Sequence, residues 1–229
     1  MLLHKIRRRI AIERISGPLA PAYDKAARRV IDSYYSQVAE EIVSKLKSGK
    51  ILDLGTGPGY LPIEIVKRAP SIKVNGIDLT PKFVEIARAN AVKAGLADKL
   101  HFEVGNAAKL RFEDYSYDMV VSTGMLHSLK DPVKVIKECY RVLKPGGETW
   151  IYDPAKVVSG LSEIEVRKWK ASLTPWERFL YKVFILFQPI TCIEHYYTRE
   201  EATKMISLTE FKDYLIEGEG EEIKIKLKK

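Results

Sequence analysis

Apolar and polar residues alternate along the chain in two different periods. Before residue 49 the apolar positions recur every three or four residues, which predicts helices over residues 2–14 and 24–46. From residue 51 the pattern changes to short apolar runs separated by helical stretches. The predicted strands cover residues 51–54, 72–77, 100–104, 117–122 and 149–152. The helices between them cover residues 60–68, 80–94 and 131–143.

Strands that alternate with helices are typical of an α/β fold with a doubly wound parallel sheet. After residue 153 the rhythm changes, and residues 155–195 are predicted to be helical and rich in aromatic residues. The tail predicts a short helix over 199–206 and then two strands, 214–217 and 223–227, joined as a hairpin. No repeat or low-complexity linker divides the chain, so we expect one domain with a helical insertion. Its parts are N-terminal helices (1–48), a strand-and-helix core (49–153), the insertion (154–198) and a C-terminal helix with hairpin (199–229).

Residues at the helix ends support these boundaries. Thr80 followed by Pro81 is a typical helix start, with Thr as the cap and Pro in the first turn. Asp131 is expected to cap the helix after the fourth strand in the same way. The sequence KPGG at residues 144–147 is expected to end that helix.

The composition of the 229-residue chain indicates a globular protein, with 46% hydrophobic and 30% charged residues. Lys and Arg outnumber Asp and Glu by 38 to 30, and a net charge of +8 would suit nucleic acid, an anionic membrane or an acidic substrate. Much of the excess lies at the two chain ends, which favours a role in solubility over nucleic-acid recognition. The abundance of Ile, Lys, Glu and Arg hints at a thermophilic source.

Metal sites, disulfides and membrane spans are disfavoured by the sequence. Cys139 and Cys192 are the only cysteines and no Cys/His cluster occurs, so we expect neither a metal site nor a disulfide framework. The longest apolar stretch, 179–187, is interrupted by Lys182 and is too short to span a bilayer. The N-terminus has no signal-peptide pattern. We therefore expect a cytoplasmic protein with no integral membrane segment, and the oligomeric state stays open.

The sequence DLGTGPG at residues 53–59 is a glycine-rich turn between the first predicted strand and the helix that follows it. Glycines at such a place let the chain turn sharply and let a ligand approach the backbone. In open α/β sheets, ligands bind at the carboxyl ends of the strands. The spacing is tighter than in dinucleotide-binding motifs, and no Gly-Lys-Ser/Thr follows, so a phosphate-binding P-loop is excluded.

Polar residues also follow the next two predicted strands. Asp78 ends the second strand, where a carboxylate can accept hydrogen bonds from both hydroxyls of a ribose. The alternative role of Asp78, capping the next helix, is already partly served by Thr80. Asn106 follows the third strand, where its amide could pair with the edge of an adenine. Because Asn is common at turns, the alternative is that Asn106 only stabilises a turn after the strand.

Five motifs, taken in order, resemble those of class I methyltransferases that depend on S-adenosylmethionine (SAM). They are ILDLGTGPG at 51–59, GID at 76–78, GNA at 105–107, YDMVVS at 117–122 and RVLKPGG at 141–147. The resemblance is nearest to the ubiquinone/menaquinone-biosynthesis type (UbiE-like, methyltransferase type 11), whose members mostly methylate small molecules. It covers residues 49–153 and implies a Rossmann-like, seven-stranded, mostly parallel sheet with a reversed C-terminal hairpin. The two strands predicted in the tail agree with that implication.

The same resemblance implies which residues bind SAM. The glycine loop would wrap the methionine and ribose, Asp78 would bind the ribose hydroxyls, and Leu79 would pack on the adenine. Asn106 with Ala107 would face the adenine amino group; the family usually has Asp at the position of Asn106, and either side chain offers an oxygen acceptor. The implied cofactor-binding set is Asp53, Gly55, Thr56, Gly57, Gly59, Asp78, Leu79, Asn106, Ala107 and Thr123.

Methyl transfer requires an aligned acceptor, and an acceptor that carries a proton also requires a base. Two of the four histidines are candidates for a catalytic base. His127 follows the fourth strand on the ligand side of the sheet, where a structural role is an equal alternative, and His195 follows the aromatic insertion. Family architecture suggests that Tyr23 and Tyr34 close over the SAM.

The acceptor pocket would be formed by residues 1–48 and the aromatic insertion at 161–197. Such rings more often form core, but a pocket lined by them would favour a small apolar or aromatic molecule. Alternative acceptors are RNA (tRNA or rRNA), which the net charge would suit, and protein. No Asn/Asp-Pro-Pro-Tyr/Phe motif for base methylation and no recognisable RNA-binding module is present. A partner subunit that binds SAM without catalysis is a further alternative.

Overall fold

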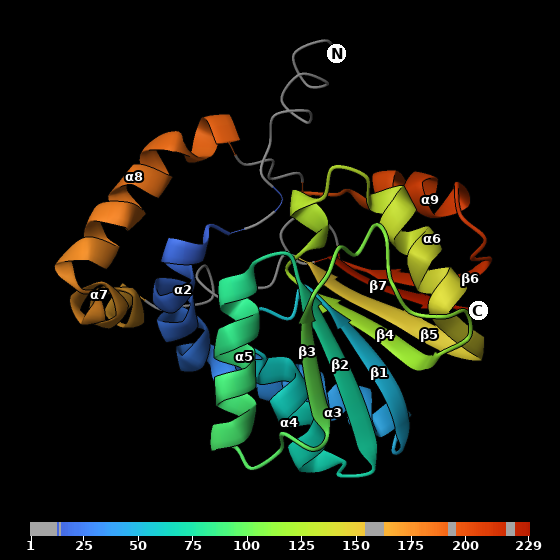
Figure 1. Cartoon of the computed structure of the whole chain (residues 1–229). Helices are drawn as coiled ribbons and strands as arrows, with labels where there is room; N and C mark the ends of the chain where they lie inside the picture. Colours follow the sequence, from blue (N-terminus) through green and yellow to red (C-terminus); the bar gives the residue numbers. More distant parts are fainter. Residues whose placement is uncertain (1–12, 14, 154–162, 192–195, 219–222) are drawn as a thin grey trace.

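The computed structural model describes residues 13, 15–153, 163–191, 196–218 and 223–229. A seven-stranded sheet forms the centre of the molecule, in the order β3-β2-β1-β4-β5-β7-β6 (Figure 1). The first five strands run parallel, and β7 is antiparallel to both β5 and β6. The strands are β1 (Gly49–Leu54), β2 (Ile72–Asp78), β3 (Leu100–Val104), β4 (Tyr117–Thr123), β5 (Leu143–Asp153), β6 (Asp213–Glu217) and β7 (Ile223–Lys228). The predicted α/β class and the reversed C-terminal hairpin are confirmed.

Helices pack on both faces of this sheet, because its central strands are apolar on both sides. In β1, Ile51 belongs to one hydrophobic core and its neighbour Leu52 to the other, and both are fully buried. The first core contains apolar residues of α3, α4 and α5, and the second contains those of α6 and α9. The helices are α3 (Ser36–Lys45), α4 (Tyr60–Arg68), α5 (Pro81–Lys93), α6 (Pro132–Val142) and α9 (Arg199–Ser207). The run of apolar residues in β1 therefore predicted correctly that it is buried on both faces.

The N-terminal helical region differs from its prediction. The sequence predicted one helix over 24–46, but the chain forms α2 (Ala20–Ala27), a 3₁₀ turn (Arg28–Val30), a π-helical turn (Ile31–Tyr35) and then α3. Val30 and Tyr35 are five positions apart and both buried, a spacing that a wide π turn can serve. The helix predicted over residues 2–14 lies outside the described residues except for Glu13.

The two predicted helix caps have different outcomes. Asp131 caps α6 as expected, since its carboxylate accepts a hydrogen bond from the backbone N–H of Lys134 at 3.0 Å. Thr80 precedes α5, but its side chain does not cap that helix. Its hydroxyl donates instead to the backbone carbonyl of Ile15 at 2.8 Å. Thr80 therefore occupies the N-cap position with Pro81 in the first turn, as predicted, although its side chain makes no capping hydrogen bond.

Residues 144–147 end α6 as predicted, but they do not form a separate turn before a short strand. β5 begins at Leu143, which pairs with Tyr117, and the pairing resumes between Glu148 and Met119. The intervening residues form an irregularity in the strand, with Gly146 at a φ of +79°. The fifth strand is therefore longer than its apolar run, because the glycines permit a bulge that keeps both ends paired.

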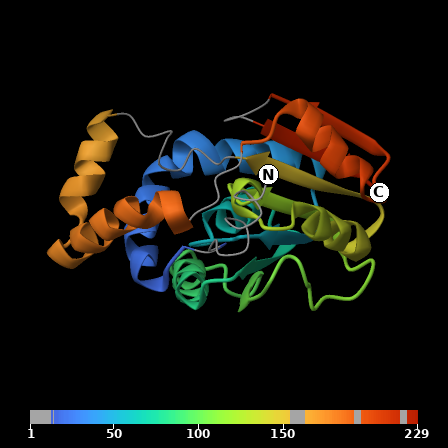
Figure 2. The same cartoon turned by 90° about the horizontal axis from the view of Figure 1, so that it is seen from above.

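The predicted helical insertion contains α7 (Glu163–Ser172) and α8 (Pro175–Thr191). In Figure 2 both helices stand beside α2, at the opposite end of the molecule from the β6–β7 hairpin. Trp169 of α7 is buried and donates its indole N–H to the backbone carbonyl of Ala22 at 3.0 Å. The insertion is therefore attached to the N-terminal region.

Candidate functional site

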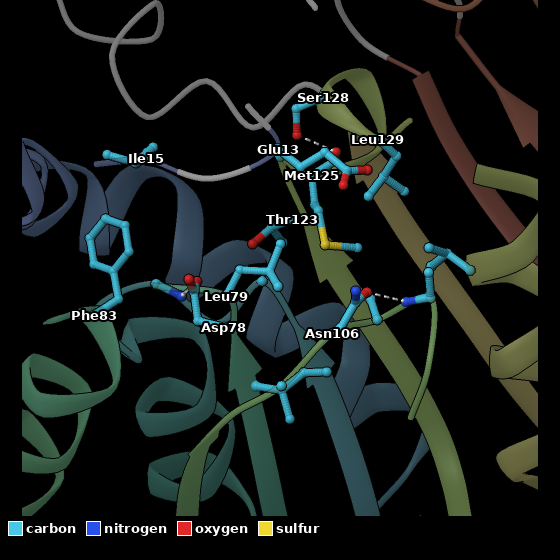
Figure 3. A pocket seen from close by; sticks show the side chains of 18 of the residues that line it. Glu13, Ile15, Asp78, Leu79, Phe83, Asn106, Thr123, Met125, Ser128 and Leu129 are labelled. Carbon is cyan, nitrogen blue, oxygen red and sulfur yellow. Dashed lines mark hydrogen bonds between the residues drawn. The ribbon is translucent and has the colours of Figure 1, made fainter. Parts of the chain in front are cut away.

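A cavity opens at the carboxyl ends of β1, β2, β3 and β4 (Figure 3). It lies where the strand order reverses between β1 and β4, and its empty space is about 780 Å³, open mouth included. Predicted cofactor residues that line it are Gly55, Gly57, Asp78, Leu79, Asn106, Ala107 and Thr123. The fold thus brings together residues from four strand ends at the place where α/β sheets bind ligands.

The glycine loop after β1 forms one wall of this cavity. The backbone N–H groups of Gly55 and Thr56 both donate to the carbonyl of Ile77 at 2.9 Å, which ties the loop to β2. Gly55 and Gly57 have φ values of +71° and +52°, a left-handed conformation that glycine adopts without strain. A Cβ atom on Gly55 would lie 3.1 Å from Sδ of Met125. The missing side chain is therefore what lets Met125 approach the loop.

Gly59, the last glycine of the motif, lies outside the cavity lining. Its φ is +79°, and a Cβ there would lie 3.0 Å from both Cβ of Ala87 and Cζ of Phe102. Gly59 therefore lets the start of α4 pack closely against α5 and β3. The motif combines two glycines at the cavity with one at a packing contact.

Asp78 presents a half-buried carboxylate to the cavity. The backbone N–H of Gly57 donates to Oδ2 at 3.0 Å, and that of Thr80 donates to Oδ1 at 2.8 Å. Because a carboxylate oxygen can accept about two hydrogen bonds, each oxygen keeps capacity for a ligand donor. Burial raises the pKa of Asp78, while these two backbone bonds act in the opposite direction.

Asp53 and Thr56 lie under the glycine loop, outside the cavity lining. Asp53 is 1% exposed, and burial raises the pKa of its carboxyl to about 7. Asp53 Oδ1 and Thr56 Oγ1 have no hydrogen-bond partner among the described residues. A buried polar atom without a partner is costly, so these two atoms are suited to a donor that a ligand brings.

Several of the residues that line the cavity are apolar. Leu79 and Phe83 line it beside β2 and α5, and Ala107 lines it after β3. Asn106 also lines the cavity, and its Oδ1 accepts a hydrogen bond from the backbone N–H of Ala108 at 2.8 Å (Figure 3). Asn106 therefore stabilises a turn and faces the cavity, so its two alternative roles are compatible.

Two residues of the N-terminal region, which the sequence assigned as a whole to the acceptor side, line the cavity. They are Glu13 and Ile15, neither of which was singled out from the sequence. Oε1 of Glu13 accepts a hydrogen bond from the backbone N–H of Lys130 at 2.6 Å, and the carbonyl of Ile15 accepts the Thr80 hydroxyl. No local pattern could have predicted this, because the contacts join residues more than sixty positions apart in the sequence.

Of the two tyrosines expected to close over the cofactor, only Tyr23 lines the cavity. Its ring packs edge-on against Phe83 with centroids 5.3 Å apart, and burial raises its pKa to about 12. Tyr34 lies outside the lining, and its hydroxyl is buried without a partner among the described residues. Tyr23 is therefore the tyrosine positioned to contact a ligand.

His127 lies in the loop after β4, next to the cavity-lining Met125 and Ser128 but not in the lining itself. Both its backbone N–H and its ring contact the buried Asp153 at the end of β5. The N–H donates to Oδ2 at 2.8 Å, and Nδ1 lies 3.0 Å from Oδ1. Asp153 thus fixes both the loop and the imidazole. The other candidate base, His195, lies outside the described residues.

A family model described as a methyltransferase domain matches residues 45–210 of this chain. The chain belongs to the methyltransferase-domain family. The match includes the four strand ends that form the cavity, and it confirms the resemblance to class I SAM-dependent methyltransferases.

Curated relatives of this chain include enzymes named for quinone biosynthesis. The ubiquinone/menaquinone biosynthesis C-methyltransferase UbiE of Geotalea daltonii is 30% identical over 146 residues, which are 62% of this chain and 62% of that protein. The demethylmenaquinone methyltransferase of Thermus thermophilus is 33% identical over 149 residues, 62% of this chain and 67% of that protein. The methyltransferase therefore matches less than two thirds of the length of the Geotalea protein.

Solved structures confirm the fold of the chain. A Methanococcus maripaludis structure, provisionally described as a SAM-dependent methyltransferase, has a TM-score of 0.70 at 24% identity and covers 92% of this chain and 91% of its own. A SAM-dependent methyltransferase from Aquifex aeolicus has a TM-score of 0.59 at 20% identity, and the match covers 83% of this chain and 88% of that chain. Within the described residues, no helix of the methyltransferase is long and apolar enough to cross a bilayer, and no three His, Cys, Asp or Glu side chains form a group that could hold a metal.

Proposed function

We propose that this methyltransferase transfers a methyl group from SAM to a small apolar or aromatic acceptor. One observation carries the proposal: the Asp78 carboxylate and the bare backbone of Gly55 and Gly57 line the same cavity, at the switch point of the sheet. The cavity lining combines polar and apolar residues, as an adenosyl ligand with a charged amino-acid part requires.

The residues present fit SAM at both ends. Asp78 would accept the ribose hydroxyls with the capacity left on its two oxygens. Leu79 and Phe83 would pack on the adenine, with Asn106 at its polar edge. The unpartnered Oδ1 of Asp53 would accept a hydrogen bond from the amino group of the methionine part.

Bound SAM supplies a methyl group that is already activated on a sulfonium. The protein then has to position the acceptor, exclude water and receive any proton that the acceptor loses. We assign the proton to Nε2 of His127, because the Asp153 carboxylate beside Nδ1 favours the tautomer in which Nδ1 carries the hydrogen. His195 remains the second candidate for this role.

The acceptor that we favour is a hydroquinone-type ring. Relatives of this chain are named as C- and O-methyltransferases of ubiquinone or menaquinone biosynthesis, and the aromatic insertion would provide an apolar surface for such a ring. We also propose that the chain acts as one domain, in which the N-terminal region and the insertion form the acceptor side.

The experiment is transfer from methyl-labelled SAM to a panel of benzene and naphthalene hydroquinones, followed by mass spectrometry. Methyl transfer to RNA and to protein from a cell extract is assayed in parallel. Label on a hydroquinone is expected. Label on RNA or protein alone would show that the acceptor is a macromolecule and not a hydroquinone. SAM binding with no labelled product in any mixture would indicate a non-catalytic SAM-binding subunit.

Replacement of His127 by Ala is expected to lower kcat about 10²–10⁴-fold, the range typical of a lost general base. Its affinity for SAM should change less than about twofold, because His127 lies outside the cavity lining. The matched control is His101→Ala, since His101 is exposed on the edge strand β3. An unchanged kcat in the His127 variant would show that the residue is structural.

A further inference from the structure

The α7–α8 hairpin carries exposed aromatic side chains on its outer surface. Trp176 and Phe179 are 64% and 54% exposed, and their rings stack on each other with centroids 5.5 Å apart and planes 24° apart. Lys182 follows at the same spacing of three residues and is also exposed. These three side chains therefore form a stripe along α8 that ends in a cation.

The inner surface of the same hairpin is already occupied. Trp169 packs edge-on against Tyr181 and donates to the carbonyl of Ala22 in α2. Glu177 is buried in an ion pair with Lys25 of α2 at 2.8 Å. The hairpin is thus held in a fixed position with its inner side on the protein and its aromatic stripe outward.

Between residues 166 and 183, where side chains are described, the exposed charged residues are all basic. They are Arg167, Lys168, Lys170, Arg178 and Lys182. The acidic residue in this range, Glu177, is buried. Arg178 donates to the carbonyls of Ala171 and Leu173 at the end of α7. The excess of basic side chains favours an anionic partner.

We infer that this outer surface, formed by Arg167, Lys168, Lys170, Trp176, Phe179 and Lys182, docks on an anionic lipid bilayer. Trp and Phe prefer the interface between headgroups and acyl chains, and Lys and Arg extend to the headgroup phosphates. Charge complementarity and exposed apolar area thus favour the same partner. We name this set the hairpin surface.

A lipid partner explains the ring geometry better than a nucleic acid does. Single-stranded nucleic acids bind by stacking bases on aromatic faces. Trp176 and Phe179 already stack on each other, which uses one face of each ring.

The hairpin surface is connected to the cofactor cavity through α2. The hairpin is attached to α2, and α2 carries the cavity-lining Tyr23. The docking itself rests on the hairpin surface alone and does not depend on the proposed methyl transfer.

The test is binding of the full chain to phosphatidylcholine vesicles with and without phosphatidylglycerol, measured by co-sedimentation in the absence of SAM. Trp176 is a natural probe, because Trp150 and Trp169 are 4% and 3% exposed. We expect binding only to the anionic vesicles, with a blue shift of the tryptophan emission and quenching by brominated lipid. High salt should weaken the binding.

Two variants separate the contributions, each with a matched control. The triple variant Lys168→Gln/Lys170→Gln/Lys182→Gln is expected to bind about a hundredfold more weakly. Its control removes three exposed lysines elsewhere, Lys47, Lys73 and Lys93. The variant Trp176→Ser/Phe179→Ser should lose binding, unlike a control that replaces the exposed Val92 and Leu208 by Ser.

Four outcomes would overturn the inference. They are equal binding to neutral vesicles, equal loss in the variants and their controls, no vesicle binding at all, and salt-sensitive binding to single-stranded RNA without vesicle binding. The last outcome would assign the hairpin surface to a nucleic acid. Because SAM is absent from the assay, failure of docking leaves the proposed methyl transfer untouched.

Discussion

Asp53 and Asp78 end neighbouring strands, yet their carboxylates have different surroundings. Asp78 accepts two backbone N–H groups and faces the cavity, so its charge is supported before any ligand binds. Asp53 is buried, and its Oδ1 lacks a partner among the described residues. The ionisation of Asp53 is therefore governed chiefly by its burial.

The raised pKa of Asp53 predicts a pH-dependent stability. Burial moves this pKa to about 7, so the folded chain favours the protonated carboxyl. The contribution of Asp53 to the free energy of unfolding is therefore present below the unfolded pKa of about 4, and it is lost as pH rises toward 7. The free energy of unfolding is measured with urea at about pH 5 and pH 8. From the lower to the higher pH it should fall on the order of 1–4 kcal/mol more in wild type than in Asp53→Asn. Parallel pH profiles of the two proteins would contradict this.

The glycines of the loop should respond differently to a methyl group. Gly59→Ala is expected to lower the free energy of unfolding by about 2–4 kcal/mol, because it adds both φ strain and a contact with Ala87 and Phe102. Gly57→Ala should lower the free energy of unfolding by only about 1 kcal/mol, because the nearest atom to its added Cβ, in Tyr23, is 3.9 Å away. It should weaken SAM binding about tenfold or more, because the added methyl group would lie at the cavity.

The control for these glycine variants is Gly146→Ala. Gly146 has the same φ of +79° as Gly59, and nothing lies within 4 Å of its added Cβ. It should show the strain of about 1 kcal/mol without any change in SAM affinity. Equal destabilisation by Gly59→Ala and Gly146→Ala would show that the packing contact at Gly59 is unimportant.

At the scale of elements, local pattern predicted most of the sheet and its helices. The 60–68 helix and the 100–104 strand agree with α4 and β3 residue for residue, because apolar period and flanking turn residues indicate the same boundaries. The pattern failed at 28–35, where a π turn changes the helical period, and at 144–147, where a strand continues through glycines. Both failures are places where tertiary pairing overrides local preference.

Thr80 shows a different limit, because its hydroxyl is used at long range. Thr80→Val removes the bond to the carbonyl of Ile15 at nearly constant volume. We expect a loss of about 1 kcal/mol in stability and faster amide exchange near residue 15. Thr149→Val is the matched control, since the Thr149 hydroxyl is buried with no hydrogen-bond partner among the described residues. Equal effects in both variants, measured by hydrogen exchange and urea unfolding, would contradict the role of Thr80.

In the whole molecule, the site is formed by segments from residue 13 to residue 135. Its sequence-local part was predictable, because a glycine loop and Asp78 follow strands whose carboxyl ends must meet at one edge of the sheet. The contributions of Glu13, Phe83 and Met125 were not predictable, since each is brought to the cavity by packing rather than by a motif. The acceptor side depends on the same long-range packing of the N-terminal region and the insertion.

Calorimetric titration of the full chain with S-adenosylhomocysteine, the demethylated form of SAM, tests whether the cavity is the cofactor site. Asp78→Ala should weaken binding roughly 10- to 150-fold, the loss expected for a hydrogen bond to a charged group. The control is Asp131→Ala, which also removes a carboxylate that accepts a backbone N–H but lies outside the cavity. If Asp78→Ala binds the ligand as tightly as wild type and Asp131→Ala do, the carboxylate at the end of β2 does not hold the ribose and the cavity is not the SAM site.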